Sequence, residues 1–361
     1  MIEKKSLFTF LYLSLLFLYL PTEAAKKTKI GFFINYLSVR GTEVSTYDYA
    51  DFNETILKNE SVIINNIGDS RYSNGKPLPD YSNSTREKFL KRFGNNYFEC
   101  STMQEVDQIL LQEKVDILYM QKAGSRSDNK ISKVCKNAIH VVFPEFEPHG
   151  EVYACISEWL SKLNPQLRLP YVPYIAHLPD TKETLHDELG LQPNTIIFGR
   201  HGGADSFDII FAQEAVIEIA KQKKDWYFLF LNTIKFCDLP NVIFLPATAD
   251  MLYKTKFINT CDIMIHARHR GETFGLACAE FSIKNKPVIT WNGSFERSHI
   301  EILGTKGLYY NTKEELIRLI LECGIKINDI RSKNWDAYSE KFNPTAVMNM
   351  FNNVFIKPFI K

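Results

Sequence analysis

Buried-strand and amphipathic-helix patterns alternate along the first half of the chain. Residues 30–37 form an apolar run, a turn follows at 40–42, and residues 43–57 repeat their apolar positions with a period near 3.6. Further strands are predicted from short apolar runs at 62–65, 97–100, 115–120, 138–143 and 152–156, with a helix at 102–113 between two of them. Strands that alternate with helices predict a parallel sheet covered on both faces.

The alternation stops at residues 164–179 and then begins again. Four prolines fall in this stretch, and proline is excluded from helix interiors and central strands. The second series predicts strands at 195–198, 226–231, 242–245, 263–267 and 288–291, and helices at 206–222, 249–259, 274–284 and 313–323. A last helical pattern covers 332–355, with a break at Pro344.

Two such series predict an α/β protein with two Rossmann-like domains facing each other across a cleft. We place the N-terminal domain at 26–178, the C-terminal domain at 179–330 and a pair of terminal helices at 331–361. The carboxyl ends of the two sheets would border the cleft, which is where open α/β sheets bind ligands.

Residues 1–25 have a different composition from the rest. Lys4 and Lys5 precede an apolar stretch at 7–20, which is followed by Pro21 and small residues, the layout of a secretory signal. Fourteen apolar residues are fewer than the roughly 20 of a membrane span. The interpretations are, in order, a cleaved signal peptide, an uncleaved membrane anchor and a simple soluble terminus. The first two predict a protein that is exported or membrane-associated.

Charge and cysteine content exclude two classes of partner. The 43 lysines and arginines nearly balance the 42 aspartates and glutamates, so no overall basic field exists to attract nucleic acid. The seven cysteines are scattered and lack the C-x-x-C pairs of a structural zinc site. We expect reduced cysteines, no metal and no nucleic-acid partner.

The segment from Gly271 to Glu280 carries the most chemical information. It joins a predicted strand to a predicted helix, and Gly275 lets the backbone approach a ligand closely. The first-turn amides and the helix dipole favour an anion such as a diphosphate. Glu280 can accept hydrogen bonds from ribose hydroxyls, and Glu272 from sugar hydroxyls. The plain alternative is a dipole-stabilised acid followed by an ordinary surface glutamate.

Glu272 and Glu280, with Phe274-Gly275-Leu276 between them, resemble the E-x7-E signature of retaining glycosyltransferases of family 4. That family has the GT-B fold of two Rossmann-like domains. The resemblance implies that Glu272 lies beside the donor sugar, that Glu280 binds the ribose, and that the backbone of Phe274, Gly275 and Leu276 contacts the diphosphate.

The resemblance also implies an activity, with the donor and the acceptor bound by different domains. A sugar would move from a nucleotide-diphosphate sugar to an acceptor hydroxyl with retention of configuration. The donor would bind residues 179–330 and the acceptor, a glycan, lipid or other alcohol, residues 26–178. The terminal helices would cross back to the first domain, and no cofactor beyond the donor substrate would be needed.

The strand end at Arg200 resembles the family's second motif, in which an arginine binds the donor diphosphate. A guanidinium suits this role because it is permanently charged and forks across two oxygens. Gly202 and Gly203 could add backbone amides. The family usually has a lysine five positions after the arginine, but this chain has Asp205. The alternative is therefore a weak or inactive protein that binds nucleotide sugars or glycans.

Basic residues before Glu272 could compensate for that missing lysine. Arg268 and Arg270 both precede the glutamate, and Arg268 is a predicted donor-binding residue. His266 and His269 lie in the same stretch, but strand-to-loop geometry does not put both on one face, so a metal site there has little support.

In the first half, Arg40, Gly41 and Thr42 are similar to the family's glycine-rich loop after the first strand, and we predict that they contact acceptor or phosphate. The family also keeps a histidine on this side of the cleft. His149 is our candidate catalytic histidine, together with Glu272 and Arg200, and His140 is second. Strand alternation would instead pack His140 against a helix.

The turn at 36–41 lacks the G-x-G-x-x-G fingerprint of dinucleotide binding. A nicotinamide-dependent oxidoreductase is therefore disfavoured, although it shares the Rossmann architecture.

Overall fold

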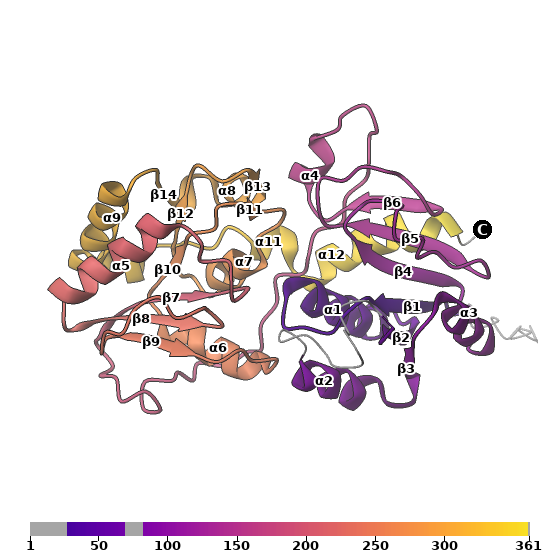
Figure 1. The fold of residues 1–361 in the computed structure, drawn as a ribbon, viewed down its shortest axis with the longest axis horizontal. Coiled ribbons are helices and arrows are strands. Elements are labelled where there is room, and N and C mark those ends of the chain that lie inside the picture. Colours follow the sequence, from indigo (N-terminus) through magenta and orange to yellow (C-terminus); the bar gives the residue numbers. More distant parts are fainter. Residues whose placement is uncertain (1–26, 69–81, 360–361) are drawn as a thin grey trace, which may run out of the picture.

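The computed structural model describes residues 27–68 and 82–359 and contains two lobes, each built on a six-stranded parallel sheet (Figure 1). The predicted signal peptide or anchor at 1–25 lies outside the described residues. Within the described ranges, no helix is both long and apolar enough to cross a membrane. The predicted class of two Rossmann-like α/β units is confirmed.

The first lobe has the strand order β3-β2-β1-β4-β5-β6. Its strands are β1 (Lys29–Ile34), β2 (Glu60–Asn66), β3 (Tyr97–Cys100), β4 (Ile117–Lys122), β5 (Lys136–Val141) and β6 (Val152–Cys155). Its helices are α1 (Gly41–Thr55), α2 (Asn83–Phe93), α3 (Met103–Gln112) and α4 (Glu158–Lys162). Every residue of β4 is buried, as expected of a central parallel strand.

The second lobe has the strand order β14-β12-β10-β7-β8-β9. Its strands are β7 (Ile196–His201), β8 (Trp226–Leu231), β9 (Val242–Leu245), β10 (Ile263–His266), β12 (Val288–Trp291) and β14 (Gly307–Tyr310), and a separate pair joins β11 (Gly271–Glu272) to β13 (Glu296–Arg297). Its helices are α5 (Ile210–Gln222), α6 (Met251–Thr260), α7 (Leu276–Ile283), α8 (Ser298–Leu303), α9 (Lys313–Ile325) and α10 (Ile327–Ser332).

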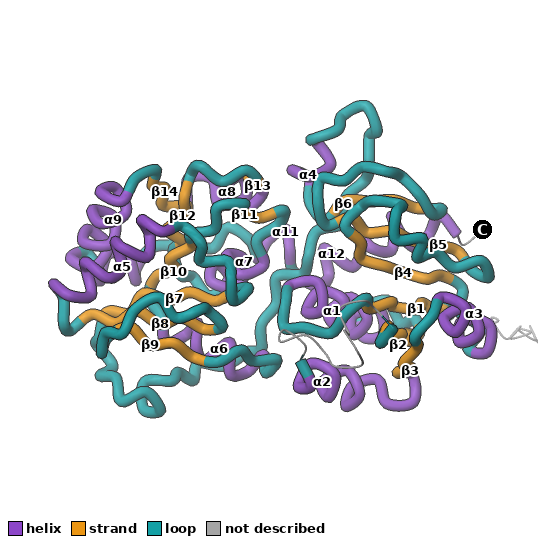
Figure 2. Tube along the Cα trace, in the orientation of Figure 1, coloured by secondary structure: helices purple, strands orange, loops and turns teal. Residues whose placement is uncertain are grey.

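The chain passes between the lobes twice, once as a loop after α4 and once through the terminal helices (Figures 1 and 2). The second passage contains α11 (Ser339–Phe342) and α12 (Pro344–Phe351). Pro344 is the first residue of α12, where its missing N–H needs no partner, and Asn343 caps the helix by accepting from the Ala346 amide.

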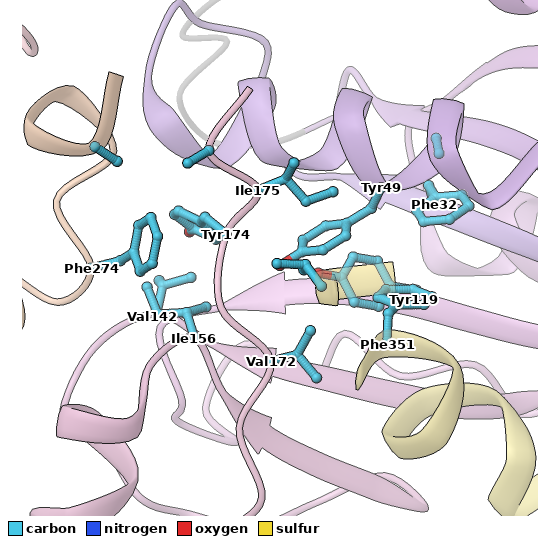
Figure 3. Packing of buried hydrophobic residues seen from close by; sticks show 14 of the residues in the cluster. Phe32, Tyr49, Tyr119, Val142, Ile156, Val172, Tyr174, Ile175, Phe274 and Phe351 are labelled. Carbon is cyan, nitrogen blue, oxygen red and sulfur yellow. The ribbon is translucent and has the colours of Figure 1, made fainter. Parts of the chain in front are cut away.

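Helix α12 packs against the first lobe through Phe351. Its ring centroid lies 5.1 Å from that of Tyr49 on α1 and 5.2 Å from that of Tyr119 on β4 (Figure 3). All three side chains are fully buried. Helix α12 therefore belongs to the hydrophobic core of the first lobe, although it follows the second lobe in sequence.

We expect Phe351→Ala to destabilise the protein by about 3–5 kcal/mol, because it removes a buried ring from a core that cannot collapse around it. Chemical denaturation would measure the loss. Ile325→Ala, at a site that is 74% exposed, is the matched control and should change stability by no more than about 0.5 kcal/mol. Equal transitions for the two variants would contradict the packing described for α12.

Candidate functional site

A cavity of about 570 Å³ lies between the lobes, at the carboxyl ends of both sheets. The first lobe contributes the loop after β1, including Arg40, Gly41 and Thr42. The second lobe contributes the loops after β7 and β10 and the start of α7. An added Cβ on Gly41 would lie 3.8 Å from Leu276 Cδ2, so the first-lobe loop approaches α7 closely.

The amino end of α7 opens onto this cavity. Thr273, Leu276 and Ala277 line it, and the first N–H groups of a helix have no partner within the helix. Gly275, the cap residue, has φ +88° and provides no side chain to accept from them. A Cβ there would lie 2.7 Å from His299 Cβ, so only glycine fits. The helix start therefore presents backbone donors to a ligand.

Phe274 has a different position from its predicted neighbours. Its side chain is 1% exposed and does not line the cavity. The ring packs edge-on against Tyr174 of the inter-lobe loop, with the centroids 5.6 Å apart (Figure 3). It also packs edge-on against Phe342, with the centroids 5.3 Å apart. Phe274 therefore anchors the loop before α7, and only its backbone remains a candidate for ligand contact.

Glu272 points into the cavity with its carboxylate held from one side. Arg268 Nη1 donates to Oε2 at 2.9 Å, and His266 Nε2 lies 3.3 Å from Oε1. Burial alone would raise the pKa of Glu272, but Arg268 and His266 outweigh it and hold that pKa at about 2. The carboxylate is therefore ionised at neutral pH, and its remaining lone pairs can accept from hydroxyl groups.

Glu280 is paired more tightly than the sequence suggested. Lys254 Nζ on α6 donates to Oε1 at 2.5 Å, and the carboxylate is only 1% exposed. His201 Nε2 lies 2.9 Å from Oε2, but the two atoms are not aligned as a hydrogen bond. Burial opposes ionisation, yet Lys254 and His201 keep the pKa of Glu280 at about 2. Oε2 thus has no hydrogen-bond donor within the described residues.

Arg200 is buried and links neighbouring loops by hydrogen bonds. Its terminal nitrogens donate to the carbonyls of Asn232 and Gly203, and to the hydroxyls of Thr233 and Ser206. Burial lowers its pKa to about 10, so it stays charged at neutral pH. The guanidinium lines the cavity, but these contacts mean that its first effect is to shape the loop that contains Gly202 and Gly203.

Neither candidate histidine of the first lobe lines the cavity. His149 lies in the loop between β5 and β6, and its Nδ1 lies 2.7 Å from the Glu147 carbonyl. His140 is fully buried, with Nδ1 2.6 Å from the Tyr119 hydroxyl, and burial lowers its pKa to about 3. The packing predicted from strand alternation is confirmed for His140, and the structure does not support a substrate contact by His149.

The other basic residues near Glu272 lie in different places relative to the cavity. Arg268 lines the cavity, whereas Arg270 and His269 do not. Arg270 pairs with Glu296 at 2.8 Å, and its guanidinium carbon lies 4.3 Å from the ring centroid of Phe143 in the other lobe. Asp205 is exposed at the cavity edge. Across 27–68 and 82–359, no group of three or more metal-ligating side chains is gathered.

Four lysines that the sequence did not single out line the cavity: Lys88, Lys122, Lys130 and Lys254. Lys254 reaches it from α6, and Lys88 reaches it from α2 of the first lobe. Lys88 Nζ lies 4.0 Å from the ring centroid of Tyr47, and burial lowers its pKa. No sequence motif marks these positions, because each side chain reaches the cavity only through the packing of the folded chain.

Comparisons with known proteins identify the architecture. No protein-family model and no curated protein sequence matches the chain. Solved structures do match it. A glycosyltransferase from Rickettsia africae has 14% identity and a TM-score of 0.67, over 93% of this chain and 99% of the other. HepE of Anabaena, in complex with UDP and glucose, has 13% identity and a TM-score of 0.67, over 90% and 98%.

This chain has the GT-B fold. MnaA of S. aureus, solved with UDP, is also similar, with 14% identity and a TM-score of 0.56 over 91% of this chain and 96% of the other. These identities are too low to carry over an activity. The structural matches establish that the cavity between the lobes lies in a GT-B fold, which has the two Rossmann-like halves predicted from the sequence.

A buried acid behind the cavity provides a test of this electrostatic picture. Asp48 on α1 is 8% exposed, and burial raises its pKa to about 7 although Lys88 and Lys254 oppose the shift. The folded protein thus binds a proton that the unfolded chain releases near pH 4. Stability from this group is present at low pH and is lost as pH rises toward 7.

We expect Asp48→Asn to stabilise the protein by about 1–4 kcal/mol at pH 8, with a gain that shrinks as pH falls to 4. Denaturant midpoints measured across this range would show the trend. Asp187→Asn, at an exposed position, is the control and should give a flat difference. A pH-independent effect of Asp48→Asn would contradict the assignment.

Proposed function

We propose that this GT-B protein is a glycosyltransferase that moves a sugar from a nucleotide-diphosphate donor to an acceptor hydroxyl with retention of configuration. The observation that carries the proposal is the amino end of α7, which opens onto the inter-lobe cavity with Glu272 before it and Glu280 within it. An anion-binding helix start between two ionised carboxylates suits a ligand that combines a diphosphate with hydroxyl-rich groups.

Each part of the donor has a matching group. The diphosphate would accept from the backbone amides at the start of α7, including those of Leu276 and Ala277. The donor sugar would donate hydroxyl hydrogens to Glu272, and the ribose would donate to the carboxylate of Glu280, which lines the cavity. The complexes of HepE with UDP and glucose and of MnaA with UDP support a uridine nucleotide as the first donor to test.

The charges of the cavity suggest how the leaving group is stabilised. The second-lobe wall of the cavity has three cations and three carboxylates, so this wall alone offers no excess positive charge to a diphosphate. The cations are Arg200, Lys254 and Arg268, and the carboxylates are Asp205, Glu272 and Glu280. The α7 amides contribute partial positive charge. Lys88 on the opposite wall is a further cation within reach of the cavity.

In the proposed reaction, the bond between the anomeric carbon and the diphosphate oxygen breaks while a bond to the acceptor oxygen forms. The acceptor proton leaves with the departing diphosphate. Backbone donors at the start of α7 would stabilise the charge that develops on the diphosphate, because they are fixed before the reaction begins. The acceptor would enter along the first-lobe loop that contains Arg40, Gly41 and Thr42.

We expect Glu280→Gln to weaken UDP binding by about 10- to 100-fold, since a charge-assisted hydrogen bond contributes about 1.5–3 kcal/mol. Glu272→Gln should lower kcat by a similar factor and leave UDP affinity nearly unchanged. Calorimetry with UDP and transfer assays over a panel of nucleotide sugars would measure both.

Glu301→Gln, an exposed change on α8, and His149→Ala are the controls and should alter neither value. Product analysis in the same assays tests the proposal itself. Formation of an epimeric nucleotide sugar without an acceptor would indicate an epimerase, and binding without turnover would indicate a non-catalytic nucleotide-sugar-binding protein. Retention would be read from the anomeric configuration of the product.

We expect Asp205→Lys to strengthen UDP binding and to raise turnover by about tenfold, because it adds a cation at the cavity edge where family 4 enzymes have a lysine. Asp205→Asn separates removal of the negative charge from addition of the positive one. A loss of UDP affinity in the lysine variant would show that position 205 does not face the diphosphate.

A further inference from the structure

A buried chain of polar side chains continues behind Glu272. His266 Nε2 lies 3.3 Å from Glu272 Oε1, and His266 Nδ1 lies 2.8 Å from Thr290 Oγ1. Thr290 Oγ1 in turn lies 3.1 Å from His299 Nε2. The threonine and both histidines are at most 5% exposed, and the two imidazole centroids are 4.8 Å apart.

The ionised carboxylate fixes the direction of the first hydrogen bond in this chain, and a neutral His266 would fix the other two. Glu272 can only accept, so His266 Nε2 must carry the hydrogen. A neutral His266 then accepts at Nδ1 from the Thr290 hydroxyl. That hydroxyl has one hydrogen, so it must accept from His299 Nε2. His299 Nδ1 is left without a hydrogen, and it has no hydrogen-bond partner within the described residues.

The opposite direction requires a less favourable arrangement. If His266 were a cation, its Nδ1–H would donate to Thr290, and Thr290 would donate to His299 Nε2. His299 would then carry its hydrogen on Nδ1, as a buried donor without an acceptor. The charge would also sit beside Arg268, which already neutralises Glu272 at 2.9 Å. His299 Nδ1 lacks a partner in either arrangement, so the nearby positive charge of Arg268 is the point that favours the neutral form of His266.

We infer that Thr290 and His299 are positioning residues, which hold His266 as a neutral Nε2–H donor and thereby fix the orientation of the Glu272 carboxylate. Arg268 takes Oε2 and His266 takes Oε1, so the lone pairs left for a ligand have a defined direction. Rotation of the carboxylate would lose both bonds. The consequence for sugar binding rests on the proposed function, whereas the hydrogen-bond directions do not.

Nitrogen-15 NMR of histidine-labelled full-length protein tests the directions without an activity assay. His266 and His299 signals would be assigned from His266→Gln and His299→Gln. We expect both rings to be neutral at pH 7, with the hydrogen on Nε2. An Nδ1–H tautomer or an imidazolium at either position would overturn the inference, whether or not the protein transfers sugars.

Thr290→Val keeps the shape of the side chain but removes the hydroxyl, and Thr290→Ser keeps the hydroxyl. We expect the valine variant to lose the fixed tautomer of His266 and to lower kcat about tenfold, with unchanged UDP affinity. The serine variant should restore both the NMR signature and kcat. Equal kcat in all three proteins, or a loss that serine does not rescue, would overturn the positioning role.

If the wild-type protein binds UDP but transfers no sugar, the proposed function fails while the NMR result still decides the hydrogen-bond directions. If the valine variant does not fold, the wild-type tautomers decide the inference alone. The two conclusions are therefore separable.

Discussion

The contact between Phe274 and the aromatic side chains around it determines how the two lobes meet. Its ring comes from the loop before α7 and packs on Tyr174, Tyr338 and Phe342, which belong to the two passages between the lobes. Such aromatic pairs contribute through both buried area and edge-to-face geometry. Because Phe274 lies between Glu272 and Gly275, this packing also fixes where the carboxylate and the helix start face the cavity.

Burial then limits which charges the cavity can tolerate. A buried carboxylate without a partner is strongly unfavourable, and the second lobe meets this by pairing Glu272 with Arg268 and Glu280 with Lys254. Both carboxylates therefore stay ionised, but their charges are balanced by those of Arg268 and Lys254. The wall is close to neutral, so in the proposed function a diphosphate would be bound on that side mainly by oriented amide dipoles.

The sequence predicts the fold well where burial determines the pattern. Four strands begin and end at the predicted residues: Tyr97–Cys100, Trp226–Leu231, Val242–Leu245 and Val288–Trp291. Helix α2 was not predicted because it has few apolar side chains and only Thr85, Phe89 and Phe93 are buried. Strand β14 was not predicted because it is an edge strand whose residues are mostly only partly buried.

Local spacing also located Glu272, Gly275 and Glu280, since a loop followed by a helix keeps those positions near one another. It could not supply their partners. Lys254, Thr290 and His299 lie on separate elements and meet the motif only through sheet order and helix packing. The same limit explains Arg200, whose acceptors come from the loops after β7 and β8. His149 was a candidate from the family resemblance, but its side chain does not line the cavity.

The neutral wall and the first-lobe lysine together argue for a coupling between the lobes. If the second lobe held an excess of cations, it would bind a nucleotide diphosphate equally well with the first lobe near or far. With Arg268 and Lys254 already paired with carboxylates, its affinity depends on the α7 dipoles, on Arg200 and on first-lobe cations such as Lys88, which is carried by α2. A ligand that interacts with both walls stabilises the arrangement in which they are close, in proportion to its preference for that arrangement. In the proposed glycosyltransferase, donor binding would therefore favour the same lobe approach that brings an acceptor on the first lobe to the sugar beside Glu272.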